Sequence, residues 1–224
     1  MNKLKSHQNN NNIPLPPLVL STRNNGKISE FKQMVKDFDI ELRGLNDFGP
    51  IPEVEEDGRT FEENALKKAR FTSRVLGLPA IADDSGLVVK ALHGEPGIYS
   101  ARYAGENATD EENNTKLLKK MQGIKDRTAQ FMCVIAIAVP RGPALIYTGT
   151  CDGIILDKPR GSNGFGYDPL FYYPPLKKTF AEMTPEEKNL ISHRGRAMAE
   201  IRDEIHKILI WLKQRLDEEP TQIG

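Results

Sequence analysis

Two adjacent carboxylates, Asp83 and Asp84, follow a short apolar segment and precede Ser85 and Gly86. Hard cations that carry nucleotide phosphates are held by one or two carboxylates together with waters and phosphate oxygens, and a carboxylate at a strand end suits that role. The acidic loop at 53–57 could supply a second carboxylate, although such loops are commonly only solvated. The pair therefore predicts a metal site, with a simple polar turn as the alternative.

Residues 21–27, Ser-Thr-Arg-Asn-Asn-Gly-Lys, lie between an expected strand and an expected helix. Backbone N–H groups and the positive end of a helix dipole favour an anion at such a junction, and Lys27 adds a full positive charge. The segment is not a Walker phosphate loop, because Ser21 stands where that pattern needs glycine and Ile28 where it needs serine or threonine. It predicts either a phosphate site of another type or an ordinary turn.

Residues 161–169, Gly-Ser-Asn-Gly-Phe-Gly-Tyr-Asp-Pro, combine three glycines with two aromatic residues and an acid. They do not fit the dinucleotide-binding fingerprint, because Pro169 occupies its last glycine position and prevents a helix from passing through. Glycines let the backbone approach a ligand, Phe165 can stack on a base, and Asp168 can accept a hydrogen bond from it. The segment predicts a nucleobase pocket, with a glycine loop around one core aromatic residue as the alternative.

A basic cluster combines Lys188 with residues 192–196, Ser-His-Arg-Gly-Arg. If these residues continue one helix, Lys188, Ser192 and Gly195 share a face and the basic groups converge. The alternative is a surface histidine among arginines. Two acidic runs, at 110–112 and 217–219, are typical of solvated charge, and we assign them no function.

Alternating strands and helices are expected to position these groups. Residues 18–20 predict a strand, apolar residues at 28, 31, 35 and 38 predict a helix, and 40–45 predict a second strand. The next helix follows the loop at 50–58, with Thr60 and Glu63 as a capping box and Gly77 as its C-cap. Residues 80–83 then predict a short buried strand that ends on the acids, where Gly86 allows a sharp reversal.

The second half of the chain predicts a hairpin between two capped helices. Capping boxes at 109–112 and 184–187 start these helices, the latter with proline at the first helical position. Between them, 128–139 and 144–155 predict long strands joined by a tight turn. A hairpin makes its two strands antiparallel, so the fold class is α/β with a mixed sheet.

Composition excludes several classes of protein. The 224 residues include 31 basic and 31 acidic ones, so no whole-molecule field draws the chain to nucleic acid or an anionic membrane. The longest apolar run, 131–139, is about half of the roughly 20 residues that a membrane-spanning helix needs. Residues 1–12 contain no apolar stretch typical of a secretion signal, so we expect a cytoplasmic protein. Cys133 and Cys151 lack metal-site or CxxC spacing and are expected to be buried.

The chain is expected to form one folded domain at 15–217, preceded by a leader at 1–14 and followed by a tail at 218–224. The leader is predicted to be disordered, because its Asn-rich run has nothing to bury and prolines restrict the entry to the first strand. No internal repeat divides the rest.

Six motifs occur in an order that resembles one known family. They are S-T-x-N-x-G-K at 21–27, T-F-E-E-N-A at 60–65, A-D-D-S-G at 82–86, P-G-I-Y-S-A-R-Y-A-G at 96–105, G-F-G-Y-D-P at 164–169 and E-E-K-N-L-I-S-H-R-G at 186–195. With these motifs the sequence resembles the Ham1/RdgB family of non-canonical purine nucleoside triphosphate pyrophosphatases, also called inosine triphosphate pyrophosphatases. The resemblance covers about residues 18–215.

The resemblance implies an activity and an architecture. The activity is hydrolysis of ITP, dITP or XTP to the monophosphate and pyrophosphate with Mg²⁺, which clears deaminated purines from the nucleotide pool. The fold is an elongated mixed α/β structure of two lobes with the active site in the cleft between them, generally as a homodimer.

The resemblance also implies roles for individual residues. Asp84 would be the catalytic carboxylate and a metal ligand, with Glu55 as the second ligand, although adjacent Glu56 leaves that choice open. Residues of the first motif would bind the substrate: Thr22, Arg23, Asn24, Asn25, Gly26 and Lys27. Of these, Thr22, Asn24 and Lys27 would hold the triphosphate, and Lys188 would reach the same anion. The nucleoside end of the pocket would be formed by Ser85, Phe165, Asp168, His193 and Arg194, with Gly166 and Tyr167 also binding substrate.

Two departures and two rival functions accompany this resemblance. Arg23 occupies a turn position often held by glycine in relatives, and Tyr167 stands where some have tryptophan. A Maf-type pyrophosphatase shares the opening motif but should lack G-F-G-Y-D and S-H-R-G, which are present here. A non-enzymatic nucleotide-binding module would use the same basic residues without needing Asp84.

Overall fold

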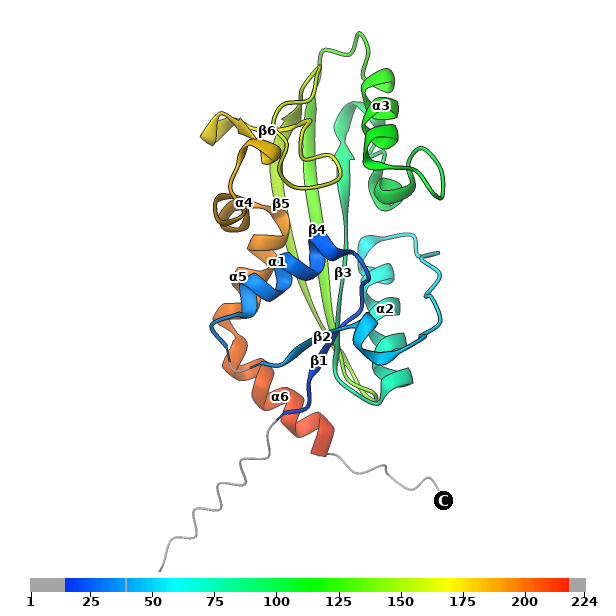
Figure 1. Cartoon of the computed structure of the whole chain (residues 1–224), viewed down its shortest axis with the longest axis vertical. Coiled ribbons are helices and arrows are strands. Elements are labelled where there is room, and N and C mark those ends of the chain that lie inside the picture. Colours follow the sequence, from blue (N-terminus) through cyan, green and yellow to red (C-terminus); the bar gives the residue numbers. More distant parts are fainter. Residues whose placement is uncertain (1–14, 39, 218–224) are drawn as a thin grey trace, which may run out of the picture.

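A mixed sheet of seven strands runs along the molecule in a computed structural model that describes residues 15–38 and 40–217 (Figure 1). The expected leader and tail lie outside the described residues. The strands are β1 (Leu18–Leu20), β2 (Leu42–Gly44), β3 (Ala80–Val89), β4 (Thr128–Ala138), β5 (Ala144–Ile155), β6 (Phe171–Tyr173) and β7 (Lys178–Thr179). Their spatial order is β2-β1-β3-β4-β5-β6-β7, with β1 parallel to both of its neighbours and the later pairs antiparallel.

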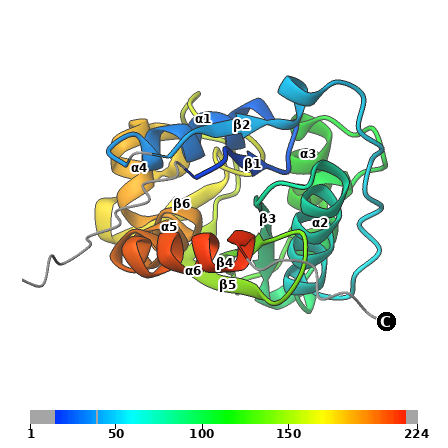
Figure 2. The same ribbon diagram turned by 90° about the horizontal axis from the view of Figure 1, so that it is seen from below.

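Helices cover both faces of this sheet. The α-helices are α1 (Asn25–Val35), α2 (Phe61–Leu76), α3 (Asp110–Lys120), α4 (Pro185–Ile191), α5 (His193–Asp203) and α6 (Ile205–Asp217). Short 3₁₀ helices are η1 (Leu45–Phe48), η2 (Lys90–Leu92), η3 (Gly97–Arg102), η4 (Pro174–Leu176) and η5 (Phe180–Glu182). Figure 2 shows α2 on one side of β3, β4 and β5, and α5 with α6 on the other.

The alternation of side chains along β4 explains this layering. Cys133, Ile135 and Ile137 pack in one core cluster with residues of α5 and α6. The intervening Val134 and Ala136 pack instead with the buried face of α2. Successive residues of a strand point to opposite faces, so one apolar strand supports a helical layer on each side.

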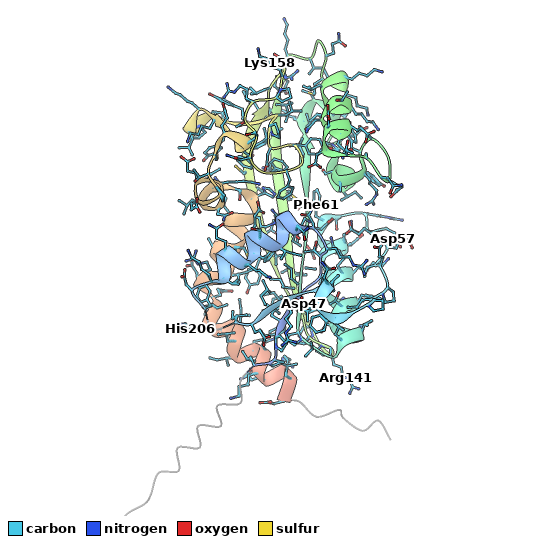
Figure 3. The ribbon with its side chains drawn as sticks, viewed as in Figure 1. Asp47, Asp57, Phe61, Arg141, Lys158 and His206 are labelled. Atoms are coloured by element: carbon cyan, nitrogen blue, oxygen red, sulfur yellow. The ribbon has the colours of Figure 1, made fainter. Side chains whose placement is uncertain are left out.

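The long hairpin of β4 and β5 joins two lobes. Arg141, in its turn, and Lys158, just after β5, lie near opposite ends of the molecule (Figure 3). A third core cluster, which includes Leu117, Phe171 and Phe180, fills the lobe that contains α3 and β6. The elongated two-lobed fold therefore agrees with the expectation from the sequence.

The strand that carries the two acids is longer than predicted. β3 spans ten residues and pairs with β4 throughout, so Asp83, Asp84 and Gly86 lie in the middle of a strand and not at a turn. Antiparallel pairing overrides the local turn tendency of these residues. Gly86 serves close packing, because a Cβ there would lie 2.4 Å from both the Gly97 carbonyl oxygen and the Ser100 hydroxyl.

The parallel strand beside β3 ends early. β1 pairs with β3 only at Val19 and Leu20, and Ser21 donates a last hydrogen bond to the Ile81 carbonyl. The residues of β3 after Ile81 consequently lie beside the turn at 21–24. This geometry brings the predicted anion-binding turn next to the two predicted carboxylates.

Most helix ends agree with the sequence. The capping boxes at 109–112 and 184–187 are present, and Gly77 ends α2 in the left-handed conformation. At Thr60 only half of the predicted box forms, because the Glu63 carboxylate accepts from the backbone N–H of Arg59 instead of Thr60.

Residues 188–195 do not form the single helix considered from their sequence. α4 ends at Ile191, and extended Ser192 caps α5 by accepting from the backbone N–H of Gly195. The serine side chain offers the backbone an alternative partner, which favours a new helix start over a continuous helix. Lys188 and Arg194 therefore lie on two helices that meet at an angle set by Ser192.

Cys133 and Cys151 are free and buried, as predicted. In the described part of the chain, no helix combines the length and apolar character needed to cross a membrane.

We predict that Gly149→Ala destabilises the fold. A Cβ at Gly149, on β5, would lie 2.1 Å from the His193 carbonyl oxygen and 2.6 Å from the Ala197 backbone nitrogen. Because both atoms belong to the backbone of α5, the helix must move, which costs roughly 1–3 kcal/mol of unfolding free energy. Urea unfolding measures this loss. Gly44→Ala is the control, since its Cβ would make an ordinary 3.7 Å contact with Ile28; equal losses in both variants would contradict the prediction.

Candidate active site

A cleft of about 1020 Å³ collects the predicted site residues from distant parts of the chain. Its walls come from the turn after β1, the loop at 51–58, the middle of β3, η3, the glycine loop at 165–168 and the junction of α4 with α5. The acidic loop lines the cleft with Glu55, Glu56 and Asp57. Figure 3 labels Asp57 at the edge of the molecule. Of the predicted residues, these line the cleft: Thr22, Arg23, Asn24, Lys27, Glu55, Asp84, Ser85, Phe165, Gly166, Tyr167, Asp168, Lys188, His193 and Arg194. Asn25 and Gly26 begin α1 and are not among the lining residues.

Six charged side chains of alternating sign form a chain of ion pairs beside this cleft, and four of them line it: Lys27, Arg194, Lys188 and Asp168. The Asp83 carboxylate forms an ion pair with Lys27 Nζ at 3.1 Å and accepts a hydrogen bond from Arg194 Nη2 at 2.9 Å. Arg194 also pairs with Glu30 of α1, and Glu30 accepts from Lys188 Nζ at 2.9 Å. Lys188 in turn lies 2.7 Å from the carboxylate of Asp168. We call this set the buried charge chain: Lys27, Asp83, Arg194, Glu30, Lys188 and Asp168.

The members of the buried charge chain are at most 16% exposed. Burial alone would raise the pKa of Asp83, but Lys27, Arg194 and Lys68 outweigh it and hold that pKa far below its usual range. Burial would likewise raise the pKa of Glu30, which Arg194 and Lys188 lower overall. Both carboxylates therefore remain ionised as counter-ions of the cations.

Asp84 lies in a different environment from its neighbour. Burial raises the pKa of Asp84, Lys68 offsets part of this effect, and nearby Glu56 adds to it. Lys68 Nζ lies 3.1 Å from Asp84 Oδ1, and Asn64 donates to Oδ2 at 3.2 Å. The cations around Asp83 therefore lower its pKa, whereas burial raises the pKa of Asp84, so Asp84 is the more basic of the two carboxylates.

Lys68 and Asn64 were missed as functional residues at the level of sequence. Both lie on α2, four positions apart, so they share one helix face. This face also buries Phe61, Ala65 and Ala69, and a lysine within such an apolar pattern was a usable signal. Glu30 gave a weaker signal, one turn after Lys27 on α1.

The structure distinguishes Glu55 from Glu56. Lys68 Nζ bridges Asp84 and Glu56, at 2.8 Å from Glu56 Oε1, whereas Glu55 is exposed at the cleft wall. The Lys68 ammonium thus lies between the carboxylates of Asp84 and Glu56. Carboxylate oxygens are also ligands that suit Mg²⁺. Among the described residues no cluster of three or more potential metal-ligating side chains forms, so phosphate oxygens and waters must complete any coordination sphere.

The glycine loop places an aromatic ring over the basic groups. Lys188 Nζ lies 4.6 Å from the centre of the Phe165 ring, and a Cβ at Gly26 would lie only 2.8 Å from that ring. Asp168 Oδ2 accepts from the backbone N–H of Phe165 at 3.0 Å and from Lys188. Asp168 therefore organises the loop as well as lining the cleft, and its contact with a base stays a prediction.

His193 is a buried residue, so the alternative of a surface histidine is wrong. Its ring stacks on Phe131 with centroids 4.7 Å apart and planes 10° from parallel. Its Nδ1 atom is buried and has no hydrogen-bond partner among the residues described. Burial, with the adjacent positive charges of Arg194 and Lys188, lowers the pKa of His193 well below its usual value, so the ring is neutral.

Two further residues hold the cleft walls in place. Arg23 pairs with Glu53 at 2.9 Å and donates to the Ile51 carbonyl, which joins the turn after β1 to the acidic loop. Asp110, to which the sequence assigned no function, accepts from the backbone N–H of Gly166 at 2.6 Å.

The chain belongs to the Ham1 family, whose sequence model matches residues 18–204. A dITP/XTP pyrophosphatase of Desulfotalea psychrophila is 60% identical over 92% of this chain and 92% of its own length. Another, from Syntrophobacter fumaroxidans, is 59% identical over 92% and 89%. Among solved structures, a HAM1 protein from Coxiella burnetii has a TM-score of 0.80 and 43% identity, covering 87% of this chain and all of that one. The Staphylococcus aureus Ham1 protein gives 0.78 and 46%, covering 86% and 100%.

We predict that His193 makes stability fall in acid. The folded protein keeps this ring neutral, whereas the unfolded chain binds a proton below about pH 6.5. The unfolded state then binds more protons, so His193 reduces the unfolding free energy by up to about 1.4 kcal/mol per pH unit below that value. Urea unfolding across this range should give a shallower slope for His193→Gln. His206→Gln, at an exposed position on α6, should keep the wild-type slope; an unchanged slope in His193→Gln would refute the assignment.

Proposed function

We infer that the protein hydrolyses deaminated purine nucleoside triphosphates, namely dITP, XTP and ITP, to the monophosphate and pyrophosphate, and so removes them from the nucleotide pool. The observation that carries this conclusion is one cleft that brings Asp84, held by Asn64 and Lys68, together with Lys27 at the start of α1. Asp83 holds cations for the phosphates, and Asp84 can accept a proton from water. The names of the relatives, which match along almost the whole chain, support the substrate class.

The triphosphate would bind where β1 leads into α1. Asn24 caps α1 by accepting from the backbone N–H of Lys27, and Thr22 Oγ1 accepts from the N–H of Asn24. The helix terminus and the Lys27 ammonium favour the negative phosphates. Asp83 holds this ammonium in place before the substrate arrives.

Asp84 is proposed as the base. It accepts a proton from the attacking water, the water oxygen forms a bond to the α-phosphorus, and the bond from that phosphorus to the bridging oxygen breaks. The electron pair leaves with pyrophosphate, whose charge Lys27 stabilises. The hydrogen bond from Asn64 and the ion pair with Lys68 fix the orientation of Asp84 for this step.

Mg²⁺ is the proposed cofactor. Asp84 would hold it together with a glutamate of the acidic loop, and the contacts of Lys68 favour Glu56 over the expected Glu55 for this second place. When bound, the ion neutralises phosphate charge and makes the phosphorus more open to attack.

The nucleoside end is proposed to select the base. Phe165 would stack on the purine, and the region around His193 and Arg194 would face its 6-position. Hypoxanthine and xanthine carry an oxygen there, which pairs with a cationic donor, whereas adenine carries an amino group, which does not. Buried donors left unpaired by the wrong base discriminate strongly, so ITP and XTP should exceed ATP by at least about a hundredfold in kcat/KM.

The protein is proposed to be a homodimer with a cytoplasmic location. A single folded domain at 15–217 is part of the same proposal. The Maf-type alternative is disfavoured by the presence of the glycine loop and of the motif around His193 in the cleft.

We predict that Asp84→Asn lowers kcat for XTP by at least about a hundredfold while leaving much of the binding intact, because it removes the proton acceptor and keeps the shape. Pyrophosphate release measures turnover, and thermal unfolding checks the fold. Asp152→Asn, an exposed change on β5 outside the cleft, should retain wild-type turnover. Near-native turnover of Asp84→Asn would contradict the assignment of the base to Asp84.

Removal of divalent metal should abolish hydrolysis. A chelator would remove the ion, and Asp84 and the loop glutamate cannot supply its positive charge. Added Mg²⁺ should restore pyrophosphate release. Glu56→Gln should raise the Mg²⁺ concentration needed for the half-maximal rate about tenfold or more. Glu55→Gln should raise that concentration less. Full activity in chelator would overturn the metal proposal, and the reverse order of the two variants would return the second place to Glu55.

A further inference from the structure

The glycine loop that carries Phe165 is held at its tip by α3, a helix on the other wall of the cleft. Asp110 accepts from the backbone N–H of Gly166 at 2.6 Å. Asn114 donates from Nδ2 to the carbonyl oxygen of the same residue at 2.9 Å. The two side chains are four positions apart on α3, so both project from one helix face. Together they bind the N–H and the carbonyl oxygen of one glycine, and we call this pair of hydrogen bonds the grip.

The helix that provides this grip is itself fixed to the catalytic strand. Asn113, on the adjacent face of α3, donates to the Ala101 carbonyl and accepts from the N–H of Ala104, which ties α3 to η3. Ser100 of η3 accepts from the backbone N–H of Leu87, three residues after Asp84 on β3. A hydrogen-bonded path therefore connects the strand of the proposed base to the tip of the glycine loop.

The loop needs such support because its backbone has little intrinsic preference. Gly161, Gly164 and Gly166 all have positive φ angles, between 62° and 82°, where glycine is unstrained but also conformationally free. Phe165 directly precedes the gripped glycine and is half-buried. Holding the Gly166 peptide thus removes freedom from the aromatic ring next to it.

We propose that Asp110 and Asn114 are positioning residues, which hold the Gly166 peptide and thereby place the Phe165 ring for the nucleobase. The proposal rests on the proposed function and deepens it, because it assigns base affinity to a helix that contributes nothing to phosphate binding. The phosphates are proposed to bind around Lys27, whereas Asp110 and Asn114 make their hydrogen bonds to the glycine loop at Gly166.

Enzyme kinetics with matched variants test the proposal. Asp110→Ala removes the acceptor and Asp110→Asn keeps an acceptor oxygen. Glu111→Ala makes the same charge change at the neighbouring position, which is exposed like Asp110. We expect Asp110→Ala to raise KM for XTP about tenfold, as loss of a hydrogen bond to a charged group implies. Inhibition by pyrophosphate, which has no base, should change less than about twofold, and Asp110→Asn should recover most of the affinity. Glu111→Ala should match the wild type.

A double-mutant cycle shows whether Asp110 acts through the ring. In a Phe165→Ala background, adding Asp110→Ala should change KM by less than about twofold, because there is no ring left to place. Asn114→Leu removes the hydrogen bond to the Gly166 carbonyl oxygen and should reproduce the kinetic pattern of Asp110→Ala. It provides the same test if Asp110→Ala does not fold.

Three results would overturn the proposal: an unchanged KM in Asp110→Ala and Asn114→Leu, an equal loss of pyrophosphate inhibition, or an undiminished effect in the Phe165→Ala background. A wild-type protein that does not hydrolyse XTP would contradict the proposed function instead. The affinity of the same variants for inosine monophosphate, measured by calorimetry, would then decide the role of Asp110 independently of turnover.

Discussion

The buried charge chain places three cations and three carboxylates beside one cleft. This constrains how the surrounding helices and strands can pack. An isolated charge inside a protein is costly, and a buried ion pair is tolerated only when good geometry and further hydrogen bonds compensate for lost water. Asp83 meets this condition by pairing with both Lys27 and Arg194, and Glu30 meets it by pairing with both Arg194 and Lys188. Because these residues come from α1, β3, α4 and α5, the ions can be compensated only when those elements meet in the observed arrangement.

The same arrangement prepares the cleft for its chemistry. Cations that are already oriented need no reorganisation when phosphate charge develops, and such preorganised electrostatics commonly contributes more to rate acceleration than any other single effect. Asp84 lies beside the buried charge chain but outside it, with a pKa raised by burial and only partly offset by Lys68. One strand therefore presents a permanent anion and a proton acceptor at consecutive positions, and it can do so because β1 stops at Leu20 and leaves that part of β3 beside the anion-binding turn.

Features with local causes were predictable from the sequence, and features with long-range causes were not. The caps at Thr109, Thr184 and Gly77 follow from side chains and backbone within one helical turn. The length of β3 depends on β4, which lies about fifty residues later, and no local pattern around Asp83 contains that information. The family motifs identified most of the cleft, yet they could not show that Lys68 bridges Asp84 to Glu56 or that Asp110 grips Gly166.

The central claim is that water, deprotonated at Asp84, attacks the α-phosphorus while Lys27 stabilises the leaving pyrophosphate. Hydrolysis of XTP in ¹⁸O-labelled water, with products resolved by mass spectrometry, tests this most directly, because the label marks the phosphorus that water attacked. The account predicts one ¹⁸O atom in the nucleoside monophosphate and none in pyrophosphate. Label in the pyrophosphate would place the attack on the β-phosphorus and contradict the assignment of the cleft.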